Sequence, residues 1–229
     1  MRRMRNALIA SVVLNVFLFA GVLGLGYGWP LFLHVKQVLP SRERHVSFFE
    51  TFGVEGRDVV FVGDGLTADA RWTELFPGLP VRNRGISGDT SADVAMRIGQ
   101  VAAGRPASIF LLVGGEDAAA EKTVEETAAA HGAILERIRE LSPDTRVFVQ
   151  SILPRGSESS EDVDRRNRAI REVAESEGAT WIDLGPVFAG PEGAMLPGLS
   201  NDGVHLLGSG YLAWRDAIVN FVGPPPTGP

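Results

Sequence analysis

Four side chains that can carry chemistry stand where the sequence pattern predicts strand ends or the start of the last helix. They are three carboxylates and one imidazole, namely Asp64, Glu116, Asp202 and His205. An oxygen-rich set with one histidine can hold Ca²⁺, Mg²⁺ or Mn²⁺, and a carboxylate beside a histidine can activate water. A purely structural alternative stays open, in which Asp64 binds amides of its own loop and Asp202 pairs with His205.

Apolar runs alternate with helical stretches along the sequence, and these elements must position the four side chains. Apolar, β-branched runs predict strands at 58–62, 108–113, 145–149 and 179–182, with a weaker one at 80–82. Helical stretches lie between them, near 91–104, 121–141, 161–178 and 206–222. This order is typical of a parallel sheet covered on both faces. The functional crevice of such a sheet lies beyond the carboxyl ends of the strands, where the four side chains are expected.

Four short strings at these strand ends resemble the signature blocks of the SGNH/GDSL hydrolases, especially the esterase branch similar to platelet-activating-factor acetylhydrolase. The strings are Gly63-Asp64-Gly65-Leu66-Thr67, Asn83-Arg84-Gly85-Ile86-Ser87-Gly88-Asp89-Thr90, Gly114-Gly115-Glu116-Asp117 and Asp202-Gly203-Val204-His205-Leu206. The resemblance covers residues 58–215. It implies a three-layer α/β/α, flavodoxin-like fold with a parallel five-stranded sheet, and it implies ester hydrolysis without a cofactor.

The resemblance also implies a role for each matching position. A serine at position 65 would attack the ester carbonyl, His205 would take its proton, and Asp202 would orient His205. The oxyanion would be held by the backbone N–H of residue 65, the backbone N–H of Gly85 and an asparagine side chain at position 116.

Two positions depart from that pattern. Gly65 replaces the nucleophile, a loss that costs a triad enzyme on the order of 10⁶ in turnover. Glu116 replaces the asparagine, and an ionised carboxylate accepts hydrogen bonds where the amide donates them. We therefore expect a degenerate member that acts as a ligand-binding or scaffolding domain, with an acyl- or glycan-containing ligand.

The competing hypothesis is an active ester hydrolase in which Asp202 and His205 act with water, a metal or another hydroxyl. Ser87, two residues after Gly85, is the hydroxyl expected to face the crevice. Thr67 is better explained as a turn residue, and Ser91 or Thr90 as a helix cap.

The N-terminus predicts a membrane segment. Three arginines precede residues 7–27, which contain no charged residue. Roughly 20 apolar residues are needed to cross a bilayer, and the basic flank favours a cytoplasmic N-terminus with the C-terminal domain exported. A cleaved signal peptide is the alternative. We expect an anchor at 1–28, a connector at 29–56, the hydrolase-like domain at 57–222 and a disordered tail at 223–229.

Composition narrows the possible partners. The chain has 229 residues, a formal net charge of −6 and no cysteine. An acidic chain is a poor partner for nucleic acid, and disulfides and thiolate nucleophiles are excluded. Nothing in the sequence indicates an oligomeric state.

Overall fold

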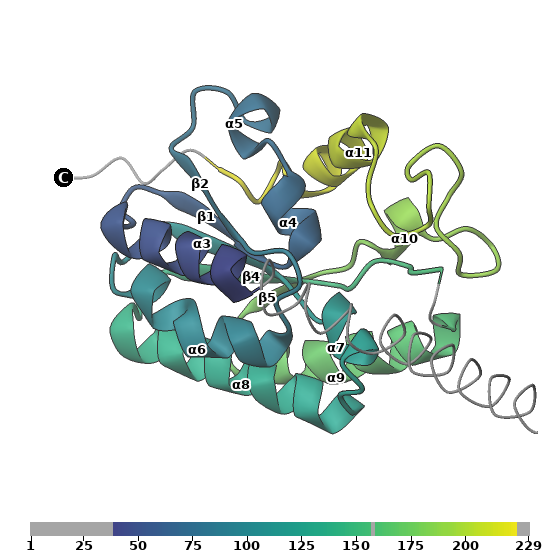
Figure 1. Cartoon of the computed structure of the whole chain (residues 1–229), viewed down its shortest axis with the longest axis horizontal. Coiled ribbons are helices and arrows are strands. Elements are labelled where there is room, and N and C mark those ends of the chain that lie inside the picture. Colours follow the sequence, from purple (N-terminus) through teal and green to yellow (C-terminus); the bar gives the residue numbers. More distant parts are fainter. Residues whose placement is uncertain (1–38, 157–158, 224–229) are drawn as a thin grey trace, which may run out of the picture. The chain divides into compact units, whose positions relative to one another are not determined.

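The computed structural model describes residues 39–156 and 159–223 (Figure 1). The chain divides into two compact units, Met1–Phe48 and Phe49–Pro229, and helix α3 (Leu39–Thr51) runs through their boundary. The predicted membrane segment at 7–27 lies outside the described residues. Within the described ranges, no helix is both long and apolar enough to cross a bilayer.

Five parallel strands form one sheet, as predicted, and their order is β2-β1-β3-β4-β5. Their bounds are Val59–Gly63, Val81–Gly85, Ser108–Leu112, Arg146–Gln150 and Thr180–Ile182 for β1 to β5. Gly63, at the end of the central strand β1, stands opposite Gly85 of β2 and Leu112 of β3. The loops that follow these three strands therefore begin at the same edge of the sheet.

Helices cover both faces of this sheet, which gives three layers (Figure 1). The helices α6 (Ser91–Ala102), α8 (Val124–Leu141) and α9 (Ser160–Ser176) pack on one face. The other face is covered by α4 (Gly65–Asp69), α5 (Trp72–Leu75), α10 (Gly185–Phe188) and α11 (Gly208–Ile218). Alternate strand residues face the two layers, because successive side chains of a strand point to opposite sides. Val60 and Val62 thus pack under α6, whereas Phe61 packs under α5.

Buried aromatic side chains fix α5 and α11 on their face of the sheet. The rings of Phe61 and Trp72 stack with centroids 3.6 Å apart, and Trp214 of α11 meets Trp72 edge to face. The indole N–H of Trp214 donates to Gln150 Oε1 at 2.6 Å, and the Tyr211 hydroxyl donates to the Leu66 carbonyl at 3.1 Å. Helix α11 is thereby tied both to β4 and to α4.

The short helices are the main difference from the sequence prediction. The helices α4, α5, α7 (Gly115–Ala119) and α10 have only four or five residues, which is too short for a hydrophobic period to show. Pro40 lies in the first turn of α3. Proline is tolerated there because the first N–H groups of a helix have no partner within it.

Candidate functional site

The four predicted strings lie where the sequence placed them. Three follow the carboxyl ends of β1, β2 and β3, and the fourth precedes α11. The fourth string is connected to the sheet edge through the loop after β4, because the Gly156 N–H donates to the Gly203 carbonyl at 3.2 Å.

Asp202 and His205 form the closest acid–imidazole contact of the site. Nδ1 of His205 lies 2.7 Å from Asp202 Oδ2. The other oxygen, Asp202 Oδ1, accepts the backbone N–H groups of Val204 and His205 at 2.9 and 2.8 Å. The hydrogen bond from His205 is the main reason that the pKa of Asp202 lies well below its usual range. The pair thus has the geometry of an ionised acid that orients a base, and the ring is largely exposed.

Gly65 is the first residue of α4, and no hydroxyl stands at that position. A Cβ atom built on Gly65 would lie 3.1 Å from Ser87 Oγ. Ser87 is therefore the hydroxyl nearest to the place where a nucleophile's side chain would begin, as expected from the sequence. Thr90 rather than Ser91 caps helix α6, with Asp93 completing a reciprocal capping box.

Asp64 is buried directly below this position, with 2% of its surface exposed. Its Oδ1 accepts the Leu66 N–H at 3.1 Å and so caps α4, whereas its Oδ2 has no partner among the described residues. Burial, followed by the negative charge of Glu116, raises the pKa of Asp64 to about 7; the Leu66 N–H and the Arg155 charge oppose that rise. The Asp64 carboxyl thus accepts a hydrogen bond from an amide of its own loop, which agrees with the structural alternative. Its pKa also places its titration near neutral pH.

Gly85 does not present its N–H to the site. That N–H donates to Asn83 Oδ1 at 2.9 Å, and a Cβ atom on Gly85 would lie 2.3 Å from the Ala68 backbone nitrogen. Gly85 thus allows β2 to approach α4 closely, which corrects its predicted role as an oxyanion donor. Gly88, which the sequence analysis left without a role, has a φ of +82° and open space around its Cα. Its N–H makes no hydrogen bond within the described part of the chain.

Glu116 is paired with an arginine that the sequence analysis missed. Nη2 of Arg155 donates to Glu116 Oε1 at 3.0 Å, with side-chain exposures of 13% for Arg155 and 32% for Glu116. Arg155 follows β4 and belongs to none of the four strings. Its charge neutralises the carboxylate that replaces the expected amide.

The four groups proposed as metal ligands, Asp64, Glu116, Asp202 and His205, do not come together. Among residues 39–156 and 159–223, no three His, Asp or Glu side chains form a group that could hold a metal ion. Asp64 and Glu116 interact electrostatically, whereas Asp202 contacts His205. The other histidine within this domain, His131, is buried, and its Nδ1 lies 2.9 Å from the Thr127 carbonyl.

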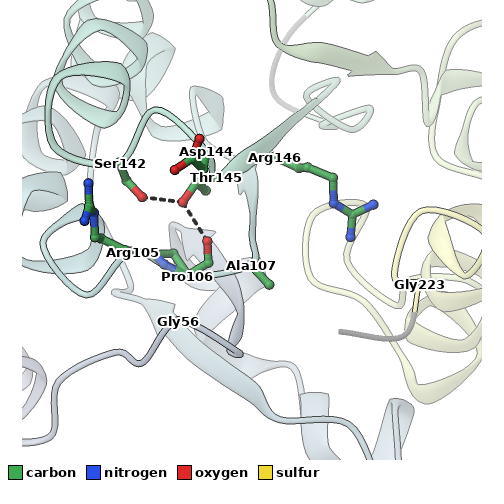
Figure 2. A pocket seen from close by; sticks show the side chains of 9 residues that line it. All are labelled: Gly56, Arg105, Pro106, Ala107, Ser142, Asp144, Thr145, Arg146 and Gly223. Carbon is green, nitrogen blue, oxygen red and sulfur yellow. Dashed lines mark hydrogen bonds between the residues drawn. The ribbon is translucent and has the colours of Figure 1, made fainter. Parts of the chain in front are cut away.

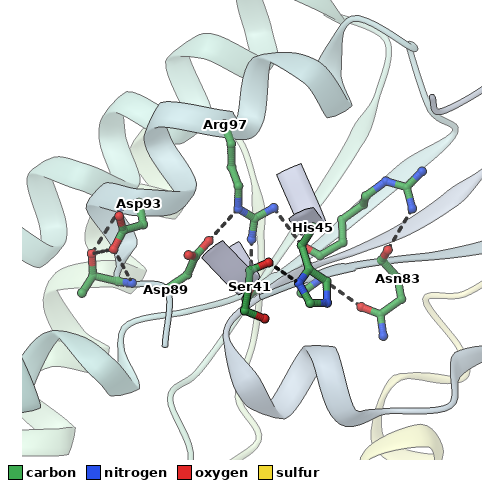
Figure 3. Close-up of polar contacts among 10 residues, drawn as sticks. Ser41, His45, Asn83, Asp89, Asp93 and Arg97 are labelled. Carbon is green, nitrogen blue, oxygen red and sulfur yellow. Dashed lines mark hydrogen bonds and ion pairs between the residues drawn. The ribbon is translucent and has the colours of Figure 1, made fainter. Parts of the chain in front are cut away.

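A buried ion pair, Arg97–Asp89, supports the loops at this edge (Figure 3). Nε of Arg97 in α6 donates to Asp89 at 2.6 Å, and its other nitrogens donate to the carbonyls of Arg84 and Gly63 at 2.9 and 3.1 Å. The Phe49 ring covers both arginines, at 4.7 Å from the Arg84 guanidinium and 5.9 Å from that of Arg97.

Arg84 also holds the chain that follows Phe49. Its Nη2 donates to the carbonyls of Phe52 and Gly53 at 2.5 and 3.5 Å. The ends of β1 and β2 are therefore joined to residues 49–53 through two arginines.

A cavity of about 620 Å³ lies elsewhere, where β3 and β4 begin (Figure 2). Figure 2 shows Arg105 and Arg146 on opposite sides of this hollow. The hydroxyls of Ser142 and Thr145 form a hydrogen bond with each other, and the Thr145 hydroxyl also donates a hydrogen bond to the Pro106 carbonyl. None of the predicted site residues lines this cavity.

The chain is similar in sequence to known proteins. The profile of the GDSL-like lipase/acylhydrolase family matches residues 47–213. Subunit alpha2 of the Homo sapiens platelet-activating factor acetylhydrolase IB is 28% identical over 193 residues, which cover 78% of this chain and 83% of that protein. Subunit alpha1 from Rattus norvegicus is 29% identical over 183 residues, covering 73% of this chain and 78% of that protein.

Solved structures give the same fold. A protein from Streptococcus pneumonia described as a platelet activating factor has a TM-score of 0.76 at 22% identity, covering 86% of this chain and 99% of its own. A GDSL-like lipase from Bacteroides thetaiotaomicron has a TM-score of 0.68 at 21% identity, covering 78% and 96%. Because the family profile spans well over half of the sequence, this chain belongs to the GDSL-like lipase/acylhydrolase family.

Proposed function

We propose that this chain is a ligand-binding member of its family that no longer hydrolyses esters through a serine. One observation carries the proposal: the position next to Asp64 has no side chain, while the Asp202–His205 pair is kept at 2.7 Å. A base without a nucleophile cannot form an acyl intermediate, and loss of the nucleophile costs on the order of 10⁶ in turnover.

The oxyanion side of the site supports the same conclusion. Glu116 accepts a hydrogen bond from Arg155, so its carboxylate does not take over the donor role of an amide. Losing one oxyanion donor costs roughly 2.7–4 kcal/mol of transition-state stabilisation. The two changes affect different parts of the mechanism, the nucleophile and the oxyanion stabilisation, and neither compensates for the other.

The ligand is proposed to contain an acyl or glycan group, because the relatives are named as acetylhydrolases and a lipase. The domain is proposed to be exported and held at a membrane by residues 7–27, which carry no charge after three arginines. Alkaline extraction of membranes, followed by protease treatment of intact cells, tests the anchor; release by alkali would contradict it.

Hydrolysis of 4-nitrophenyl acetate by the full chain in detergent tests the loss of activity. We expect turnover at background level for both the wild type and His205→Ala. The double variant Gly65→Ser, Glu116→Gln should gain activity that His205→Ala removes. Glutamine can still accept the Arg155 hydrogen bond while it donates an N–H, and Ser87 has to rotate slightly to admit the new side chain. Wild-type turnover that His205→Ala abolishes would overturn the proposal.

A second candidate function is an active hydrolase in which Ser87 is the nucleophile. The position of Ser87 Oγ, 3.1 Å from a Cβ atom built on Gly65, favours it. Ser87 Oγ would attack the ester carbonyl while His205 takes its proton. In that case Ser87→Ala abolishes turnover, and a mechanism-based serine reagent labels Ser87 in the wild type only.

A further inference from the structure

Arg155 is a guanidinium whose donors are mostly unused. A guanidinium carries five N–H groups, and within the described residues Arg155 makes one hydrogen bond, from Nη2 to Glu116 at 3.0 Å. Only 13% of its side chain is exposed, so most of this charged group is shielded from bulk water. Arg97 differs, because it donates to three acceptors of the protein.

The fold places this guanidinium between two parts of the site. Arg155 Nη1 lies 2.3 Å from where a Cβ atom on Gly115 would stand, so the absence of a side chain at Gly115 admits it. The next residue, Gly156, donates its N–H to Gly203 in the Asp202–His205 loop. The charge of Arg155 also lowers the pKa of Asp64, the residue before Gly65. The guanidinium thus lies within electrostatic range of the vacant nucleophile position.

The carboxylates of the site are largely paired, whereas several donors are open. Asp202 is paired with His205, Glu116 is paired with Arg155, and Asp64 is buried. Within the described ranges, the open donors are the remaining N–H groups of Arg155 and the N–H of Gly88. Two acceptors, Glu116 Oε2 and the buried Asp64 Oδ2, have no protein partner there. Donors in excess favour an oxyanion over a cation.

We propose that Arg155, oriented by Glu116, binds a carboxylate or phosphate group of the ligand. The inference rests on the proposed function, because it takes the site to bind rather than hydrolyse. Guanidinium groups bind planar carboxylate and phosphate oxygens in pairs. In this site a permanent anion takes the place of the transient oxyanion that a hydrolase stabilises.

Thermal unfolding of the full chain in detergent, at constant ionic strength, tests this inference. The probes are acetate, inorganic phosphate, the neutral acetamide and the cationic ethylammonium. We expect acetate or phosphate to raise the midpoint of unfolding of the wild type, because a ligand that binds the folded state stabilises it. Comparison of acetate with phosphate identifies the anion. Acetamide and ethylammonium should have no effect.

Three variants test whether the anion binds at Arg155. Arg155→Gln should weaken anion binding at least tenfold, whereas Arg137→Gln, which alters an exposed arginine paired with Glu140, should leave it unchanged. Glu116→Gln removes a competing negative charge but keeps Arg155, so it should strengthen binding severalfold. This opposite sign keeps the test valid if Arg155→Gln folds poorly.

Three outcomes would overturn the inference. The first is that neither anion changes the midpoint of unfolding up to about 100 mM, where salt screening is already strong. The second is that the anions raise the midpoint of Arg155→Gln as much as that of the wild type. The third is that only ethylammonium raises the midpoint. Ester turnover is measured on the same preparations. Turnover that depends on His205 and is inhibited by anions through Arg155 would overturn the proposed function but keep the role of Arg155. No turnover and no anion binding would overturn only the role of Arg155.

Discussion

Arg97 and Arg155 each pair with a carboxylate at the same edge of the sheet, but the two pairs differ in how deeply they are buried. The Arg97–Asp89 pair is almost completely buried, with side-chain exposures of 3% and 1%, and Arg97 also binds two carbonyls. The Arg155–Glu116 pair is partly exposed, and Arg155 binds nothing else among the described residues. The first pair holds loops together. The second leaves donors for a ligand.

The largest expected effect is on stability, in Arg97→Met. Breaking a buried ion pair by removing one partner costs about 3–5 kcal/mol, and the carbonyls of Gly63 and Arg84 lose a donor. Urea denaturation followed by circular dichroism measures the free energy of unfolding. A loss of unfolding free energy below about 1 kcal/mol would show that the Arg97–Asp89 pair does not support these loops.

The pKa of Asp64 provides a test of the surroundings of Arg155. Burial and then the charge of Glu116 raise this pKa, and the charge of Arg155 lowers it. The folded pKa of about 7 lies above the unfolded value of 3.8, so the folded state binds more protons between these pH values. Stability should therefore fall as pH rises from about 4 to 7, by about 1.4 kcal/mol for each unit of pKa difference. Asp64→Asn keeps the capping oxygen and should flatten this dependence. Equal slopes in the two proteins would contradict the raised pKa.

Arg155→Gln should destabilise the protein much less than Arg97→Met, by about 1 kcal/mol. The pair is partly exposed, so solvent screens it and can hydrate the remaining carboxylate. The same urea measurement applies. A loss as large as that of Arg97→Met would mean that Arg155 is a structural residue, and the distinction between the two arginines would fail.

The smallest effect is expected for Arg137→Gln, at the exposed Arg137–Glu140 pair on α8. Exposed pairs of this kind contribute about 0.3–0.5 kcal/mol, and 0.5 M salt should remove that contribution. The stability difference between variant and wild type is measured at low and high salt. A salt-resistant loss above 1 kcal/mol would remove this variant as a control for Arg155.

The sequence predicted the sheet and the edge that carries the site, because hydrophobic periodicity is a local property and parallel strands end together. It could not predict that the Gly85 N–H is taken by Asn83, since that bond depends on a side-chain rotamer and on the contact with Ala68. Arg155 was missed for another reason. It lies 39 residues from Glu116 and carries no motif, so only the folded chain brings the two together.

The contact of Phe49 with Arg84 and Arg97 has a mechanical consequence. Arg84 contacts the Phe49 ring and holds the carbonyls of Phe52 and Gly53. Arg97 also contacts that ring and binds the carbonyls of Gly63 and Arg84. Tension along residues 49–53 is therefore passed in part to the ends of β1 and β2, and so to the loops that follow them.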